Sequence, residues 1–260
     1  MMPVTTEPQR LPAIVLRTSS GRAANRRLPA SRRAVLFDLD DTLFPANQFR
    51  SSGFAAVGRH LAQAYELDAE MVRTALTDLS RGPARGRELQ ACARQFGLPA
   101  AVAGELVDVI RAHAPCLTLP RMTADALKAL RPAWRIGIVA NGPPEVQRRK
   151  VAALDLERRV DCIVYAHEHG SGAGKPDREP FVEALRRLDV PGSQAVFVGD
   201  DDYCDIFGAS RVGMQTVLMA AWNTTPRGPV RADSVVVNLR DVPRLAERLL
   251  DVRWRRLQVA

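Results

Sequence analysis

Short apolar runs that alternate with longer amphipathic stretches leave this chain few possible folds. The runs are rich in Val, Ile and Leu and occupy residues 34–39, 135–140, 161–166, 195–200 and 215–220, with a weaker one at 234–238. Stretches with helical spacing separate them, for example 143–156 and 178–190. Strands without polar alternation are buried on both faces, and strands that alternate with helices form parallel sheets. The sequence therefore predicts an α/β fold with a parallel sheet that helices cover on both faces.

One interval departs from this alternation. Between residues 46 and 118 the sequence carries only helical patterns, at 54–67, 68–79, 87–98 and 102–114, separated by breaks that contain Gly or Pro. We expect this block to form a helical cap, inserted after the first strand and beside the strand ends. The remaining parts, residues 34–45 and 119–260, are expected to form the α/β core.

The N-terminal segment, residues 1–33, holds most of the excess positive charge. The chain has a formal net charge of +8, and this segment contributes six of those charges with seven Arg against the single acid Glu7. Its low apolar content predicts a disordered basic tail. A start codon assigned too early and an Arg-rich transit peptide are the alternatives. The rest of the chain is nearly balanced in charge, which argues against a nucleic-acid binder.

The sequence also constrains the environment of the protein. No apolar run is long enough to span a bilayer, so we expect no membrane-embedded segment. The cysteines form no Cys-x-x-Cys pair, which is typical of reduced thiols in a cytoplasmic protein. They are Cys92, Cys116, Cys162 and Cys204. The oligomeric state cannot be predicted from these features.

Polar clusters follow the apolar runs where the predicted strands end. The first is the sequence DLDDT, in which Asp38, Asp40 and Asp41 place three carboxylates within four positions. Burying any of them is costly unless a cation or a pKa shift compensates. Similar clusters follow later runs, at 141–142, 172–177 and 200–205. The carboxyl ends of parallel strands share one edge of a sheet, so these groups should meet in one cleft, where oxygen ligands suit Mg²⁺.

Four segments, in this order, resemble the motifs of the haloacid dehalogenase-like hydrolases. They are DLDDT (38–42), IVANG (138–142), GKPD (174–177) and VGDDDYCDIFGASRVGM (198–214). The resemblance covers about residues 34–220, and the helical interval corresponds to the inserted cap of that family. It implies a Rossmann-like α/β core with a helical cap. It also implies an Mg²⁺-dependent phosphatase that hydrolyses the phosphate monoester of a small metabolite.

The resemblance assigns the catalytic roles by position. Asp38 would be the nucleophile that forms an aspartyl-phosphate, and Asp40 would be the general acid and then the general base. Lys175 would balance the negative charge of the nucleophile and of the transferring phosphoryl group. Asp38, the backbone carbonyl of Asp40, and Asp200 would hold Mg²⁺.

The remaining matched positions would support this machinery. The backbone amides of Asn141 and Gly142 would bind the phosphate. Asp201 and Asp205 would support the metal or the catalytic lysine from behind the ligands. Thr42 would shape the loop that follows the first strand.

Two residues bear on which activity to expect. Asp40 favours a phosphatase over a dehalogenase, because an alkoxide leaving group needs a proton and a halide does not. Ala140 stands where the family has Ser or Thr, and the missing hydrogen bond, worth roughly 1.5–3 kcal/mol, predicts a slower or narrower enzyme. A phosphotransferase or phosphomutase stays an alternative, as does a weakly active or non-catalytic binding protein.

Charged residues in the predicted cap allow two interpretations. Arg81, Arg85 and Arg87 lie close together in the sequence SRGPARGREL. They could bind an anionic substrate, or they could form an ordinary solvated start of a helix.

Overall fold

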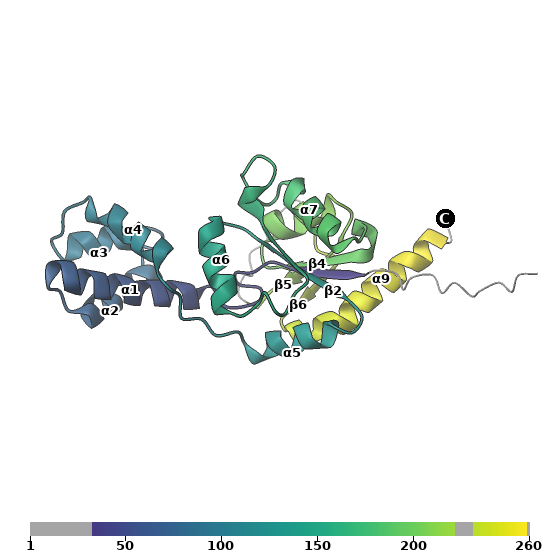
Figure 1. Ribbon diagram of the computed structural model, residues 1–260, viewed down its shortest axis with the longest axis horizontal. Coiled ribbons are helices and arrows are strands. Elements are labelled where there is room, and N and C mark those ends of the chain that lie inside the picture. The colour runs from purple at the N-terminus through teal and green to yellow at the C-terminus, as the bar shows by residue number, and fades with distance from the viewer. Residues whose placement is uncertain (1–32, 222–230, 259–260) are drawn as a thin grey trace, which may run out of the picture. The chain divides into compact units, whose positions relative to one another are not determined.

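A parallel sheet of six strands forms the centre of the computed structural model, which describes residues 33–221 and 231–258 (Figure 1). The strand order is β3-β2-β1-β4-β5-β6. Their bounds are Ala34–Phe37 for β1, Arg135–Ala140 for β2, Cys162–Tyr165 for β3, Ala195–Gly199 for β4, Gln215–Met219 for β5 and Ser234–Val236 for β6. In the parallel register, Phe37 pairs with Ile138 on one side and with Val198 on the other. The predicted α/β fold with a parallel sheet is confirmed.

Helices cover both faces of this sheet, as the doubly apolar strands require. Val35 and Phe37 of β1 belong to the apolar cluster that includes residues of α5, α6 and α9, and Leu36 belongs to the cluster that includes residues of α7 and α8. Alternate side chains of one strand therefore enter two separate cores. The bounds are Arg121–Leu130 for α5, Pro144–Ala153 for α6, Arg178–Leu188 for α7, Gly208–Ser210 for α8 and Val242–Gln258 for α9.

Four helices occupy the interval predicted to be the cap. They are α1 (Asn47–Tyr65), α2 (Ala69–Arg81), α3 (Glu88–Gln95) and α4 (Val102–Ala112). They pack around an apolar cluster of their own, which includes Phe54 of α1 and Leu106 of α4. Close packing of α1 on α2 depends on Gly58, because a Cβ there would lie 2.4 Å from the Ala69 carbonyl oxygen. The bounds of the cap as a separate domain stay a prediction.

The first cap helix begins earlier than predicted, at Asn47 instead of residue 54. Its first turns carry Ser and Gln and show little amphipathic pattern. Hydrogen bonds with the segment between α4 and α5 stabilise these first turns. The Gln48 Oε1 accepts from the Thr118 N–H at 2.8 Å, and the Ser52 Oγ accepts from the Cys116 N–H at 2.8 Å. Such contacts between distant residues leave no local signal in the sequence.

Short helices complete the described chain. Three are 3₁₀ turns, at Ala166–Glu168, Gly192–Gln194 and Leu239–Asp241. A π-helical segment, η3, spans Asp202–Phe207, and two residues separate it from the end of β4. Within the described residues, no helix combines the length and the apolar character needed to cross a membrane. The predicted tail at 1–33 lies outside the described residues apart from Arg33.

Candidate active site

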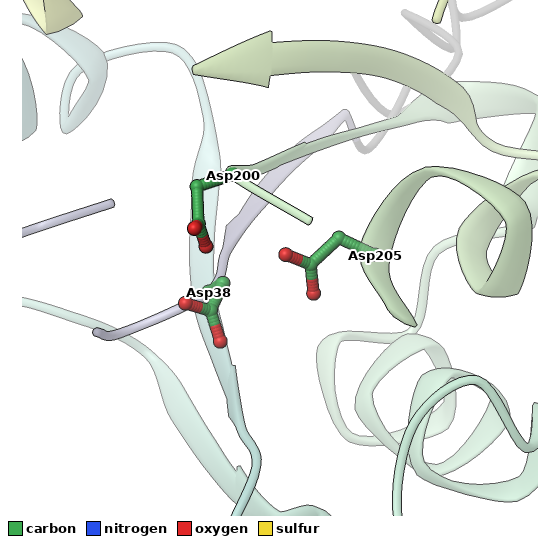
Figure 2. A group of neighbouring side chains, drawn as sticks. All are labelled: Asp38, Asp200 and Asp205. Atoms are coloured by element: carbon green, nitrogen blue, oxygen red, sulfur yellow. The ribbon is translucent and has the colours of Figure 1, made fainter. Parts of the chain in front are cut away.

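Three acidic side chains meet at the carboxyl edge of the sheet. Asp38 directly follows β1, and its N–H donates to the Val198 carbonyl at 2.9 Å, which continues the pairing of β1 with β4. Asp200 follows β4, and Asp205 lies on η3. Figure 2 shows the three carboxylates turned toward one another. One oxygen of each carboxylate lies within 4.8 Å of one oxygen of each of the other two. Two of these segments are 162 positions apart in the chain, and the parallel register brings them together.

Lys175 joins two of these carboxylates. Its Nζ lies 2.5 Å from the Asp38 Oδ1 and 2.5 Å from the Asp205 Oδ1. The lysine is only 4% exposed, so neither contact is screened by bulk water. Burial alone would lower the pKa of Lys175, but the charges of Asp205 and Asp38 outweigh it and raise that pKa. The lysine therefore stays a cation and fixes the position of Asp38.

The loop after β2 holds the lysine in place. The Asn141 Oδ1 accepts from the Lys175 N–H at 2.8 Å, so this side chain binds the backbone of the neighbouring loop. The Asn141 carbonyl accepts from the Gln147 Nε2 at 2.6 Å. Gly142 has a φ of +116°, and a Cβ there would lie 2.7 Å from the Gln147 Nε2. The use of the Asn141 and Gly142 amides for phosphate stays a prediction.

Two of the clustered acids have strongly raised pKa values. Burial raises the pKa of Asp38 to about 7 despite the lowering effect of Lys175, and the charges of Asp205 and Asp40 add to the increase. Burial also raises the pKa of Asp200 to about 8, with the charges of Asp38 and Asp205 next in effect. The clustered carboxylates therefore favour protonation, or a cation, at neutral pH.

The donor set fits a divalent cation. Asp38, Asp200 and Asp205 bring three negative charges when ionised, and Lys175 supplies one positive charge. The excess of two negative charges equals the charge of one divalent ion, and all the ligand atoms are carboxylate oxygens, which hard cations prefer. Both carboxylate oxygens of Asp205 already accept a hydrogen bond, one from Lys175 and the other from the Asp201 N–H at 3.1 Å. Asp38 and Asp200 are therefore the stronger candidates for metal ligands.

Asp201 and Thr42 form no hydrogen bond with Lys175 in the described structure. The Asp201 Oδ1 accepts from the N–H groups of Tyr203 and Cys204 at 2.9 and 2.7 Å, so this carboxylate caps η3. The predicted support of Lys175 thus comes from Asp205 and not from Asp201. Thr42 is fully buried, and its hydroxyl has no hydrogen-bond partner in the described structure. Its predicted role in the loop stays a prediction.

Asp41 shapes the loop between β1 and α1. It adopts a left-handed conformation with φ +53°, which Asp tolerates better than most residues. Its N–H donates to the Phe44 carbonyl at 2.9 Å, and its Oδ1 accepts from the Ala46 N–H at 2.8 Å. The motif DLDDT alone assigns this carboxylate no separate role. This residue ties the start of α1 to the loop that follows β1.

Lys150 contacts the predicted general acid Asp40, a contact that no pattern in the sequence predicted. Its Nζ lies 2.8 Å from each carboxylate oxygen of Asp40, and Gln147, one turn earlier on α6, donates to the same carboxylate at 3.2 Å. Lys150 is buried, and its ammonium lies 4.6 Å from the ring centre of Phe49 on α1. One signal was available, since only three of the 37 basic residues in the chain are lysines.

Metal-free protein should become less stable as the pH rises from about 4 to about 8. In this range Asp38 and Asp200 keep protons in the folded chain that they lose in the unfolded chain, because their folded pKa values lie above the usual 3.8. The folded state then binds more protons than the unfolded state, so the free energy of unfolding falls as the pH rises. Thermal unfolding at pH 5 and pH 8 measures the change.

The origin of this effect can be isolated. Asp200→Asn should flatten the difference between pH 5 and pH 8, and Asp108→Asn, on the exposed side of α4, should not. A divalent cation should raise the melting temperature more at pH 8 than at pH 5, because fewer protons compete for the oxygens. A metal-free protein that gains stability over this range would contradict the raised pKa values.

Comparisons with known proteins identify a family and several relatives of this chain. The family model of the haloacid dehalogenase-like hydrolases matches residues 32–213. A glyceraldehyde 3-phosphate phosphatase of Methanopyrus kandleri is 29% identical, over 85% of this chain and 96% of the relative. A ribulose-1,5-bisphosphate 5-phosphatase of Halopiger xanaduensis is 32% identical, over 71% of this chain and 83% of the relative.

A solved structure shares the fold. The crystal structure of a HAD phosphatase from Thermococcus onnurineus has a TM-score of 0.54 and 24% identity, over 82% of this chain and 97% of that structure. Both curated relatives are phosphatases, the branch that Asp40 predicts. Because the family model covers more than two thirds of its residues, the chain belongs to the haloacid dehalogenase-like hydrolases.

Proposed function

We propose that the chain is an Mg²⁺-dependent phosphatase that hydrolyses a phosphate monoester of a small metabolite through an aspartyl-phosphate on Asp38. The observation that carries the proposal is the position of Asp38 at the end of β1, in contact with Lys175 and close to Asp200. The names of the curated relatives support a phosphatase. The Rossmann-like sheet and the family membership support the same reaction class.

The reaction would take place in two displacements. A carboxylate oxygen of Asp38 attacks the phosphorus atom, the bond to the ester oxygen breaks, and Asp40 gives its proton to the leaving alkoxide. Water then attacks the phosphorus of the aspartyl-phosphate while Asp40 accepts a proton from it. Inorganic phosphate leaves, and Asp38 regains its carboxylate.

The supporting residues have separate tasks in this proposal. Lys175 holds the attacking oxygen of Asp38 and offsets charge on the phosphoryl oxygens. The amides of Asn141 and Gly142 would donate to those oxygens. Mg²⁺, held by Asp38, Asp200 and the carbonyl of Asp40, would offset the remaining negative charge.

A screen of phosphate esters tests the proposed function. Purified protein with Mg²⁺ should release inorganic phosphate from at least one small sugar or acid phosphate, and chelation by EDTA should stop the release. Phosphate that moves to an acceptor sugar instead of water would favour a phosphotransferase. Tight Mg²⁺ binding without turnover across the panel would favour the non-catalytic interpretation that Ala140 leaves open.

Loss of Lys150 should impair the general acid more than the nucleophile. We expect Lys150→Met to lower kcat about tenfold for alkyl phosphates, because Asp40 is then no longer held by two contacts of 2.8 Å. Aryl phosphates have better leaving groups and need less protonation, so their kcat should fall less. The ratio of the two rates is the measurement.

A matched variant controls for the loss of a lysine. Lys128→Met removes an exposed lysine of α5, and its ratio of alkyl to aryl rates should equal that of the wild type. Equal losses for both substrate types in Lys150→Met would instead assign Lys150 a purely structural role.

The proposed setting is the cytoplasm. All four cysteines are free thiols, and burial raises the pKa of Cys92 and Cys162 to about 11, which keeps them protonated and unreactive. Such thiols suit a reducing compartment. The proposed partner is a small phosphorylated substrate, with no nucleic acid.

A further inference from the structure

A cavity in the predicted cap is lined by three arginines. It has a volume of about 410 Å³ and lies between α1, α2 and the loop that follows α2. Arg50 comes from α1, Arg81 from the end of α2, and Arg85 from the loop. None of the described residues that line it is acidic. The volume is within the usual range for small-molecule sites, about 300–1,000 Å³.

The arginines of this cavity have little negative charge to neutralise them. In the described part of the chain, the guanidinium groups of Arg50 and Arg85 form no ion pair, and Arg81 has only Asp78 at 4.0 Å. Both side chains of that pair are more than 70% exposed, so the pair contributes little. A cavity whose lining includes three arginines and no acidic residue suits an anion.

Other groups of the cavity also suit an anion. The N-terminus of α1 lies at one side of the cavity. No side chain caps it and its first turn has no acidic residue, so no negative charge on this turn offsets the positive end of the dipole of this 19-residue helix. Asn47 and Ser51 on the same helix are exposed and can donate hydrogen bonds. The buried ring of Phe54 adds an apolar wall.

The chain connects this cavity closely to the catalytic loop. Asn47, which lines the cavity, follows Ala46, and the Ala46 N–H donates to the Asp41 Oδ1 at 2.8 Å. Asp41 is the neighbour of Asp40, the proposed general acid. Asn47 is nine positions from Asp38 along the chain, and the hydrogen bond between Ala46 and Asp41 holds the start of α1 beside the loop that carries Asp40.

We propose that this cavity binds a second anionic group of the substrate, a phosphate or a carboxylate, while the scissile phosphate lies at Asp38. This inference rests on the proposed function and narrows its substrate class to small metabolites with two anionic groups. Of the substrates in the names of the two relatives, ribulose 1,5-bisphosphate has a second phosphate and glyceraldehyde 3-phosphate does not. The arginine cavity favours the former class.

Two pairs of compounds test the proposal. Ribulose 1,5-bisphosphate is compared with ribulose 5-phosphate, and 3-phosphoglycerate with glycerol 3-phosphate. We expect kcat/KM to be about tenfold higher or more for the member with two anionic groups in at least one pair, mainly through KM. The first pair reports a second phosphate, and the second pair reports a carboxylate.

Substitutions of single arginines show which residues cause the preference for compounds with two anionic groups. Arg50→Gln and Arg85→Gln should each lower it about fivefold or more, because each removes a charged hydrogen-bond donor. Arg94→Gln, which removes an exposed arginine of α3 outside the cavity, should keep it. No preference in either pair, or the wild-type preference in both cavity variants, would overturn the inference.

A binding experiment separates this inference from the proposed function. If no ester of the phosphate-ester screen, these four compounds included, is hydrolysed, the proposed function fails. Calorimetric titration of the full Asp38→Asn chain with the same compounds still tests the cavity. Tighter binding of the members with two anionic groups, lost in the Asp38→Asn/Arg50→Gln chain, supports the cavity. Equal binding within both pairs refutes it.

Discussion

Replacing Asp38 with Asn should reduce phosphate release by about 10⁴-fold or more in kcat, since an amide cannot form the aspartyl-phosphate. The substitution keeps the size of the side chain and removes only its charge. Lys175 retains the contact with Asp205 at 2.5 Å, so the surrounding loops should keep their positions. Rapid mixing with a phosphate ester should also show no burst of acyl-phosphate.

The thermal stability of Asp38→Asn provides a control for correct folding. Asp38 is 6% exposed, and the pKa of its carboxyl group is raised to about 7, so its negative charge opposes folding above neutral pH in metal-free protein. Asp38→Asn should therefore melt at the same temperature as the wild type or higher at pH 8. Asp108→Asn, an exposed substitution of the same kind, should keep full activity. Asp38→Asn with more than about a tenth of wild-type activity would rule out this nucleophile.

The sheet could be predicted from the sequence because its strands are apolar on both faces. Strand β2 spans Arg135–Ala140, the predicted run, and α6 spans Pro144–Ala153 within the predicted stretch 143–156. Once the strands are parallel, their carboxyl ends share an edge. The meeting of Asp38 with Lys175 therefore follows from topology, although 137 positions separate them.

Other features depended on local geometry that spacing does not encode. Asp201 and Asp205 both follow β4, and the π-helical turn decides that Asp205 contacts Lys175 while Asp201 caps the turn. The contact of Lys150 with Asp40 spans 110 positions and joins a helix face to a loop. A pattern of apolar residues locates elements, but it carries no information about which buried polar groups pair with each other.

Removing the buried lysine should have the largest effect on stability. Lys175→Met leaves Asp38 and Asp205 facing each other without their shared cation, and breaking a buried pair of this kind costs about 3–5 kcal/mol. That is a large part of the stability of a typical domain. Because Lys175 lowers the pKa of Asp38, its loss should raise that pKa further, so the destabilisation should be greater at pH 8 than at pH 6. Urea unfolding at both values measures the effect, with Lys128→Met as the control.

A second substitution separates the structural role of Lys175 from its catalytic role. Lys175→Met/Asp205→Asn removes one of the two carboxylates that lose their cation, and the repulsion between them with it, so it should recover most of the lost free energy of unfolding. Its kcat should stay low, because no cation then holds the attacking oxygen of Asp38 or offsets the phosphoryl charge. A double variant that regained activity together with stability would show that Lys175 serves only the fold. A double variant that regained stability but not activity would show that the reaction needs the positive charge of Lys175.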